Sequence, residues 1–262
     1  MRAFRTLSAL RVACGAFVGL SALALGLGSA APGGAQSLAN PQSDFVDLPP
    51  QAWLSVVERT SHGYRIGKPE AEGQLIEFIS YTCSHCADFA KQSDGTLDVA
   101  AIGPGYLSVE VRPVIRNYLD LVVTMLVQCG DPAGFKDRHR TFLYTQDEWL
   151  DKAIKAPQSQ KAIWSRGTAE GRINAAKALG FEQTLVAKGV TMPQINTCLR
   201  DERAAQEILA NDKDDRAKFE ITSTPTFAFN GEKLDEVHDW PALSATLQAR
   251  FRPDPQESVT GG

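Results

Sequence analysis

The fold of this chain is decided by QLIEFIS at residues 74–80 and by YTCSHC, which follows directly at residues 81–86. The first run is mostly apolar, rich in β-branched and aromatic residues, and preceded by Gly73, so it predicts a buried strand. A helix-compatible stretch covers residues 84–98, and residues 107–111 alternate between apolar and polar as a second strand. Strand, helix and strand in this order predict a βαβ unit and therefore an α/β fold.

The later segments predict a helical region followed by a return to the sheet. The predicted parts are the first half of the sheet domain at 63–115, a helical insertion at 116–199, and a connecting helix with the second half at 200–251. Within the second half we expect a helix at 200–219, strands at 226–229 and 232–237 joined by an Asn230-Gly231 turn, and a helix at 240–251. The insertion shows helical spacing throughout and no strand pattern.

The sequence also predicts the structure of the segments at both ends of the domain. Residues 36–62 predict an N-terminal arm lying on the domain, with a helical patch at 51–57. Residues 63–67 predict a short strand at the edge of the sheet. The polar residues 252–262 predict a disordered tail.

The first residues have the charge order of a secretory signal peptide. Three arginines precede the apolar run Val12–Gly28, and no acidic residue occurs before Asp44. We therefore predict a signal peptide at residues 1–35, cleaved after Ala35 or beside Ala30, with an uncleaved membrane anchor as the alternative. The simplest compartment for such an exported chain is the periplasm.

The charge balance excludes some classes of partner. The chain has 27 Lys and Arg against 31 Asp and Glu, and loss of the three leader arginines leaves 24 against 31, a net charge of −7. An acidic protein without a basic stripe is poorly suited to nucleic acid or anionic lipid. We expect contact with a membrane only through the signal sequence if it is uncleaved.

Cysteine use fits an oxidising compartment. Cys14 lies in the leader and would be lost with it, which leaves Cys83, Cys86, Cys129 and Cys198. An even number of cysteines in an exported protein favours disulfides. For Cys129 and Cys198 a structural disulfide between helices is the leading interpretation, and free buried thiols are the alternative.

Cys83 and Cys86 form a Cys-x-x-Cys pair at the expected junction of strand and helix. At a helix N-terminus, unpaired N–H groups and the helix dipole stabilise an anion, so Cys83 is predicted to be a thiolate and the reactive sulfur. Cys86, one turn further and deeper, is the resolving partner, and His85 between them adds a hydrogen-bond donor or, when protonated, a positive charge. A thiolate of low pKa is a good leaving group, which destabilises the disulfide and predicts an oxidant.

A second part of the site is expected far away in the sequence, at Ser223-Thr224-Pro225-Thr226. A proline at the mouth of a strand can adopt the cis peptide bond that is otherwise rare. It would then expose the main chain of Thr224 as an edge for an extended substrate, and main-chain pairing tolerates many substrate sequences.

The segments at 77–86 and 223–227, in this order, resemble the DsbA family of thiol:disulfide interchange proteins. The resemblance covers roughly residues 63–251. It implies a thioredoxin-like βαβ…ββα fold with an inserted all-helical subdomain. It also implies that Cys83 is the nucleophile, that Cys86 resolves, and that Pro225 is a cis-proline.

The resemblance further implies a proton-transfer group and partners. Glu77, in the strand beneath the site, would be a buried acid that exchanges protons with the cysteine pair. The substrates would be reduced or misoxidised exported proteins, and a membrane oxidant would recycle the reduced form. Ser84 stands where the best-known members most often have proline, and Thr224 is a residue also met in isomerases of the wider superfamily. These departures leave oxidation and isomerisation both open.

Several alternatives remain at this point. An isomerase or reductase of the same fold would use the same two sulfurs. In another class, Cys83, His85 and Cys86 would suit copper(I) or zinc in an exported metal-binding protein, although the chain has only three Met and four His. The cysteine pair could also be a structural disulfide, and Glu77 could point to water. The favoured hypothesis is a dithiol oxidase, for which no cofactor and no metal are expected.

Overall fold

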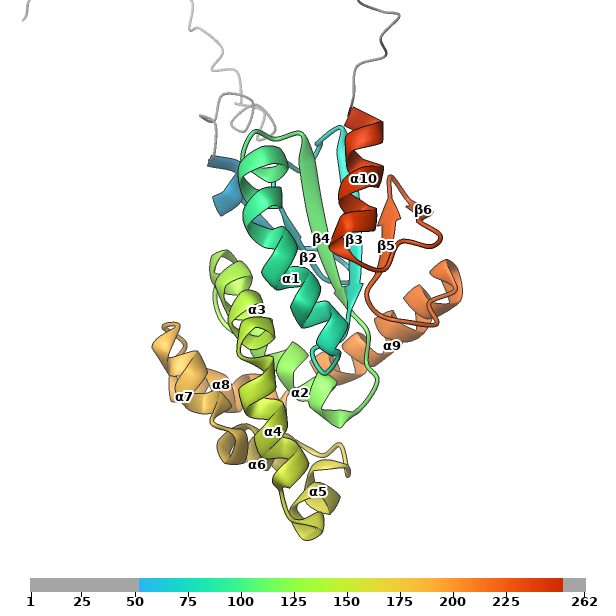
Figure 1. Cartoon of the computed structure of the whole chain (residues 1–262). Helices are drawn as coiled ribbons and strands as arrows, with labels where there is room; N and C mark the ends of the chain where they lie inside the picture. The colour runs from blue at the N-terminus through green and yellow to red at the C-terminus, as the bar shows by residue number, and fades with distance from the viewer. Residues whose placement is uncertain (1–51, 252–262) are drawn as a thin grey trace, which may run out of the picture. The chain divides into compact units, whose positions relative to one another are not determined.

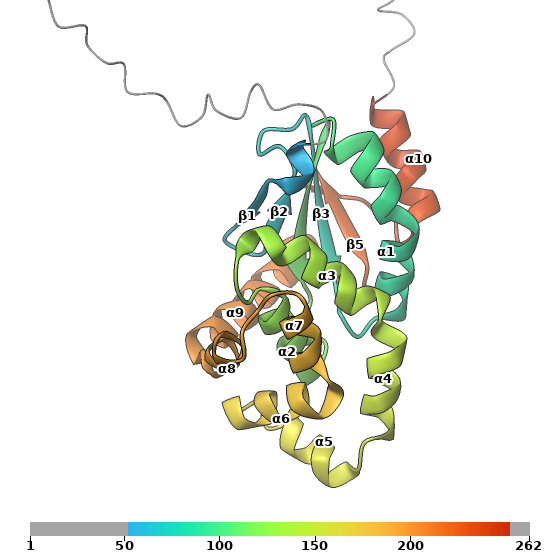
Figure 2. The same cartoon turned by 90° about the vertical axis from the view of Figure 1, so that its left-hand side faces the viewer.

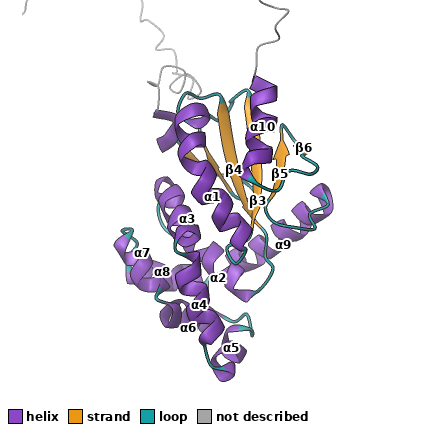
Figure 3. Cartoon of the chain, in the orientation of Figure 1, coloured by secondary structure: helices purple, strands orange, loops and turns teal. Residues whose placement is uncertain are grey.

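A mixed sheet forms the centre of the computed structural model, which describes residues 52–251 (Figures 1 and 3). Over those residues the sheet has six strands in the order β1-β2-β4-β3-β5-β6. The strands are β1 (Val57–Arg59), β2 (Tyr64–Ile66), β3 (Gly73–Ile79), β4 (Leu107–Pro113), β5 (Thr226–Phe229) and β6 (Glu232–Lys233). β3 pairs in parallel with β4 and antiparallel with β5, so the strand that leads to the cysteines lies inside the sheet.

The predicted βαβ unit is confirmed. Helix α1 (Ser84–Leu97) follows β3, continues as a π-helical segment at Asp98–Ile102, and returns the chain to β4. Parallel neighbours need such a crossover connection because the chain must travel back to the same end of the sheet. This connection places the N-terminus of α1 at the carboxyl end of β3.

The helical region also confirms the predicted fold class, an α/β sheet domain with a helix-rich insertion. Between β4 and β5 the chain is helical apart from its connections, and Figure 1 shows these helices beside and below the sheet. The helices are α2 (Tyr118–Val127), α3 (Phe135–Tyr144), α4 (Gln146–Lys155), α5 (Gln158–Trp164), α6 (Ala169–Leu179), α7 (Phe181–Ala187), α8 (Met192–Arg200) and α9 (Glu202–Phe219), with a 3₁₀ turn at Pro132–Gly134. After the sheet, α10 (Trp240–Phe251) completes the described residues.

Two predictions about the sheet edges are wrong. Tyr64–Ile66 is not an edge strand, because β1 pairs with it on its outer side, and a 3₁₀ helix at Ala52–Ser55 precedes β1. The last part of the expected N-terminal arm is therefore built into the sheet. The return strand expected at 232–237 is shorter: β6 covers only Glu232 and Lys233, and one further main-chain hydrogen bond, from Leu234 to Phe227, follows it.

Both faces of the sheet are covered, which explains the nearly continuous apolar sequence of β3. Leu75 and Ile79 belong to the large core shared with α1 and the insertion, whereas Ile76 and Phe78 pack on the opposite side with Phe219 of α9. Figure 2 shows α1 and α10 on one side of the sheet. Glu77 has the same parity as Leu75 and therefore faces α1.

The predicted leader at residues 1–35, the start of the N-terminal arm and the tail at 252–262 lie outside the described residues. From Ala52 to Phe251 no helix is long and apolar enough to cross a membrane.

Candidate active site

The junction of β3 and α1 places Cys83 at the N-cap of α1, with extended backbone angles (φ −95°, ψ 119°). Its carbonyl oxygen accepts the first helical hydrogen bonds, from the N–H groups of Cys86 and Ala87. In the first turn of the helix, the main-chain N–H groups of His85 and Cys86 also interact with the Cys83 sulfur.

This environment lowers the pKa of Cys83 from its ordinary value of 9.0 to about 4. The largest cause is a hydrogen bond from the Cys86 thiol, and Thr224 and the main-chain N–H groups of Cys86 and His85 add to it; burial acts in the opposite direction. A sulfur held by this many donors is a thiolate at neutral pH, and the thiolate is the form that reacts in disulfide exchange.

Cys86 differs from Cys83 in both access and acidity. Its side chain is completely buried (0% exposed), whereas Cys83 is 6% exposed and lines a pocket at the surface. Burial and the nearby Cys83 sulfur raise the pKa of Cys86 well above its ordinary value. Both cysteines are free thiols in this structure. The pair is thus asymmetric: Cys83 is a thiolate that lines the pocket, and Cys86 is a fully buried thiol.

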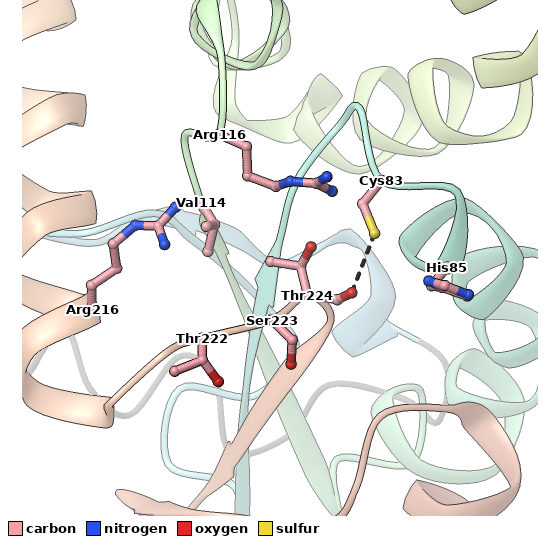
Figure 4. Close-up of a pocket in the computed structure, with 8 residues that line it drawn as sticks. All are labelled: Cys83, His85, Val114, Arg116, Arg216, Thr222, Ser223 and Thr224. Carbon is pink, nitrogen blue, oxygen red and sulfur yellow. Dashed lines mark hydrogen bonds between the residues drawn. The ribbon is translucent and has the colours of Figure 1, made fainter.

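The distant segment at 222–225 meets Cys83 directly. When it is protonated, the Cys83 Sγ donates to the main-chain oxygen of Thr224, which lies 3.2 Å away (Figure 4). The Thr224–Pro225 peptide bond is cis. Pro225 leads immediately into β5, and its own carbonyl oxygen lies 3.3 Å from Nδ1 of His238. The structure therefore brings together the two motifs that the sequence separates by about 140 residues.

A pocket of about 290 Å³ opens beside the Cys83 sulfur. Figure 4 shows its lining, which comes from the α1 N-terminus, the end of β4, α9 and the loop before β5. The lining residues are Cys83, His85, Val114, Arg116, Arg216, Thr222, Ser223 and Thr224. His85 is exposed and lies at the edge of this pocket, where it can meet a bound chain.

Glu77 is buried but lies in a different cavity. It is 5% exposed, and burial, reinforced by the negative charge of Asp94, raises its pKa to about 8 against an opposing effect of Arg140. The cavity is about 20 Å³, enough for one water molecule, and neither cysteine is among its lining residues. The alternative in which Glu77 points to water is wrong, whereas its proton exchange with the cysteine pair stays a prediction.

Two buried polar residues that the sequence did not reveal hold the turn before Cys83. Asp120 of α2 accepts hydrogen bonds from the Ser80 hydroxyl at 2.8 Å and from the Thr82 N–H at 2.9 Å. Gln146 of α4 donates from its Nε2 to the carbonyl oxygens of Tyr81 at 2.7 Å and of Cys83 at 2.9 Å. Both side chains come from the helical insertion, which thereby fixes the position of the reactive sulfur.

The other two cysteines of the described residues are bonded to each other, away from this site. Cys129, just after α2, is disulfide-bonded to Cys198 of α8. Of the residues that the structure describes, no group of three or more His, Cys, Asp or Glu side chains is arranged to hold a metal ion.

Comparison with known proteins places this geometry in a family. The family model described as thioredoxin matches residues 59–249. The chain belongs to the thioredoxin family. Among solved structures similar to this thioredoxin-family chain is a protein-disulfide isomerase from Novosphingobium aromaticivorans, with a TM-score of 0.69 and 29% identity over 72% of this chain and 97% of that one.

Other relatives are more distant. Wolbachia pipientis alpha-DsbA1 has a TM-score of 0.56 at 17% identity, covering 71% of this chain and 88% of that one, and shares the fold. The predicted resemblance to the DsbA family and the thioredoxin-like fold are thereby confirmed at the level of the fold. A Rickettsia bellii protein named "Putative protein-disulfide oxidoreductase" is 24% identical over 171 residues. The match covers 65% of this chain and 58% of the length of that curated relative.

Proposed function

We propose that this protein is an exported thiol:disulfide oxidoreductase that transfers a Cys83–Cys86 disulfide to the thiols of other proteins. The observation that carries the proposal is the asymmetry of the pair: a sulfur that lines the pocket and has a pKa of about 4 beside a fully buried thiol whose pKa is raised. The names of the Novosphingobium and Rickettsia relatives support the same chemistry.

The reaction has two exchange steps. A substrate thiolate attacks the Cys83 sulfur of the oxidised protein, the Cys83–Cys86 bond breaks, and Cys86 leaves and takes up a proton. A second substrate thiolate then attacks the substrate sulfur of the mixed disulfide, so the substrate disulfide forms and Cys83 leaves as a thiolate. Two electrons pass from the substrate to the cysteine pair, one substrate proton ends on Cys86, and the other is released to water.

Three groups support these steps in the proposal. The donors around Cys83 stabilise it as a leaving group. The main chain of Thr224 pairs with the extended substrate next to Cys83. Glu77, with a pKa raised to about 8, supplies the proton that the departing Cys86 takes up.

The direction proposed for the cell is oxidation. A stabilised Cys83 thiolate favours the reduced protein and therefore makes its disulfide an oxidant. A membrane oxidant would then restore the disulfide, and the leader would place both reactions in the periplasm. The substrates would be reduced or misoxidised exported proteins.

The deciding experiment supplies the oxidised protein with a reduced two-cysteine peptide and with glutathione buffers. We expect the peptide to be oxidised while one equivalent of protein disulfide disappears, and Cys83→Ser to abolish this. If the protein neither oxidises the peptide nor exchanges with glutathione, the proposed function is rejected.

Isomerisation is a second candidate, which the name of the Novosphingobium relative and the threonine before the cis-proline favour. The reduced protein supplied with a scrambled disulfide substrate separates the two activities. Recovery of native pairings without net oxidation would favour the isomerase. Metal analysis of protein purified under reducing conditions tests the copper or zinc alternative.

A further inference from the structure

The pocket beside Cys83 has a charge opposite to that of the chain. The sequence has more acidic than basic residues, yet the described residues that line this pocket include two arginines and no carboxylate. Arg116 comes from the loop between β4 and α2, and Arg216 comes from α9. In Figure 4 the Arg116 guanidinium points toward Cys83, and the Arg216 guanidinium points toward Val114 from the facing wall.

Hydrogen bonds to neighbouring residues fix the Arg216 side chain and the main chain of Arg116. The Arg216 Nε donates to the Asp212 carboxylate at 2.9 Å, and its Nη2 donates to the carbonyl oxygen of Ile115 at 3.4 Å. The main-chain N–H of Arg116 donates to Asp120 at 3.0 Å, the carboxylate that also fixes the turn before Cys83. Its guanidinium has no ion pair or hydrogen bond to any residue between Ala52 and Phe251, so all of its donors face solvent or an incoming chain.

We propose that Arg116 and Arg216 bind an acidic side chain next to the substrate cysteine, so that protein thiols flanked by Asp or Glu are the preferred substrates. This inference rests on the proposed function. Guanidinium groups recognise carboxylates through paired, charge-assisted hydrogen bonds. The pocket shares Thr224 with the main-chain edge beside Cys83, so a chain paired there places its neighbouring side chain between the arginines.

The test measures how fast two-cysteine peptides reduce the oxidised full-length protein. Three peptides differ only in the residue beside the cysteine, which is Glu, Gln or Lys. Each rate is divided by the thiolate fraction of its peptide, because a neighbouring carboxylate raises the pKa of the peptide thiol. We expect the Glu peptide to react about tenfold faster than the Gln peptide, and high salt to reduce the ratio.

Variants of Arg116 and Arg216 test whether the preference for the Glu peptide arises in the pocket. In the double variant Arg116→Gln, Arg216→Gln we expect the ratio of Glu to Gln rates to fall to about one. Arg203→Gln removes one positive charge from an exposed position on the same helix α9, outside the pocket, and should keep the ratio. Arg116→Glu should transfer the preference to the Lys peptide. The ratio of Glu to Gln rates is compared, and not the absolute rate, because the absolute rate also depends on the pKa of Cys83.

Two failures are distinguishable. If the Cys83–Cys86 pair exchanges with neutral dithiothreitol and oxidises all three peptides at equal corrected rates, only the preference for acidic flanks is refuted. An unchanged ratio in the double variant also refutes it. If no peptide is oxidised, the proposed function itself fails.

Discussion

Replacing Cys86 by alanine should make Cys83 a weaker acid. The hydrogen bond from the Cys86 thiol is the largest cause of the lowered pKa of Cys83, which is about 4. A hydrogen bond to a charged group contributes about 1.5–3 kcal/mol, so its loss should raise the pKa of Cys83 to roughly 5–6. The main-chain N–H groups and Thr224 remain, so the pKa should not return to its ordinary value of 9.0.

Cys86→Ser is the matched control. Serine is nearly the same size as cysteine and keeps an O–H donor, so the pKa of Cys83 should stay closer to that of the natural protein than in Cys86→Ala. The assay follows ultraviolet absorbance of the thiolate and the rate of alkylation by iodoacetamide against pH, with mass spectrometry of the Cys83 peptide to identify the reacting sulfur. Equal titration midpoints for Cys86→Ala and the natural protein would refute the assigned cause.

Three other changes test the surroundings of the site. Glu77→Gln should stabilise the fold by about 3 kcal/mol at pH 7 and have little effect near pH 4. The pKa of Glu77 is about 8 in the folded protein and ordinarily 4.5, so the natural protein loses stability as the pH rises from 4.5 to 8. Urea unfolding at pH 4 and pH 7 measures this, and equal effects at the two pH values would contradict it. Gln146→Leu should cost about 1–3 kcal/mol, because the buried Tyr81 carbonyl loses its partner while the Cys83 carbonyl keeps its helical hydrogen bonds, and it should alter Cys83 alkylation. An unchanged unfolding midpoint would count against the proposed role. Replacing Cys129 and Cys198 by serine should lower the free energy of unfolding by about 2–4 kcal/mol and leave the rate of Cys83 alkylation constant. A large change in the alkylation rate would show that the disulfide also shapes the site.

The sequence predicted those elements whose signal is local. The run at 74–80 became β3, and the helix expected at 240–251 became α10 with the same ends. Each has a periodicity of its own and a turn residue beside it, so no distant contact is needed to recognise it. The Asn230-Gly231 turn likewise predicted its hairpin, although the return strand is shorter because pairing to β5 ends near Lys233.

Features that depend on distant contacts were not predictable. Val57-Glu58-Arg59 has no alternation of apolar and polar residues, and it becomes a strand because β2 offers it an edge. Asp120 and Gln146 lie on helices whose sequences specify a start and an apolar face. Their hydrogen bonds to the turn before Cys83 arise only when the insertion packs on the sheet domain.

The same limit applies to the charge of the pocket. Arg116 and Arg216 are 100 positions apart in the sequence and belong to different elements, so neither forms a recognisable motif. By contrast, Cys83 and Thr224 were predicted to meet because the DsbA family resemblance supplied the pairing that periodicity could not.

The equilibrium between the Cys83–Cys86 pair and glutathione, measured as a reduction potential against pH, tests the central claim most directly. With Cys83 ionised above a pKa of about 4, reduction takes up a single proton, so the potential should fall by about 30 mV per pH unit between pH 5 and 8. At pH 7 the pair should be more oxidising than one with ordinary thiols by up to about 90 mV, an upper bound because solvent at the pocket screens the sulfur. A slope of about 59 mV per unit over the whole range would show that both sulfurs are protonated after reduction, and would contradict the account.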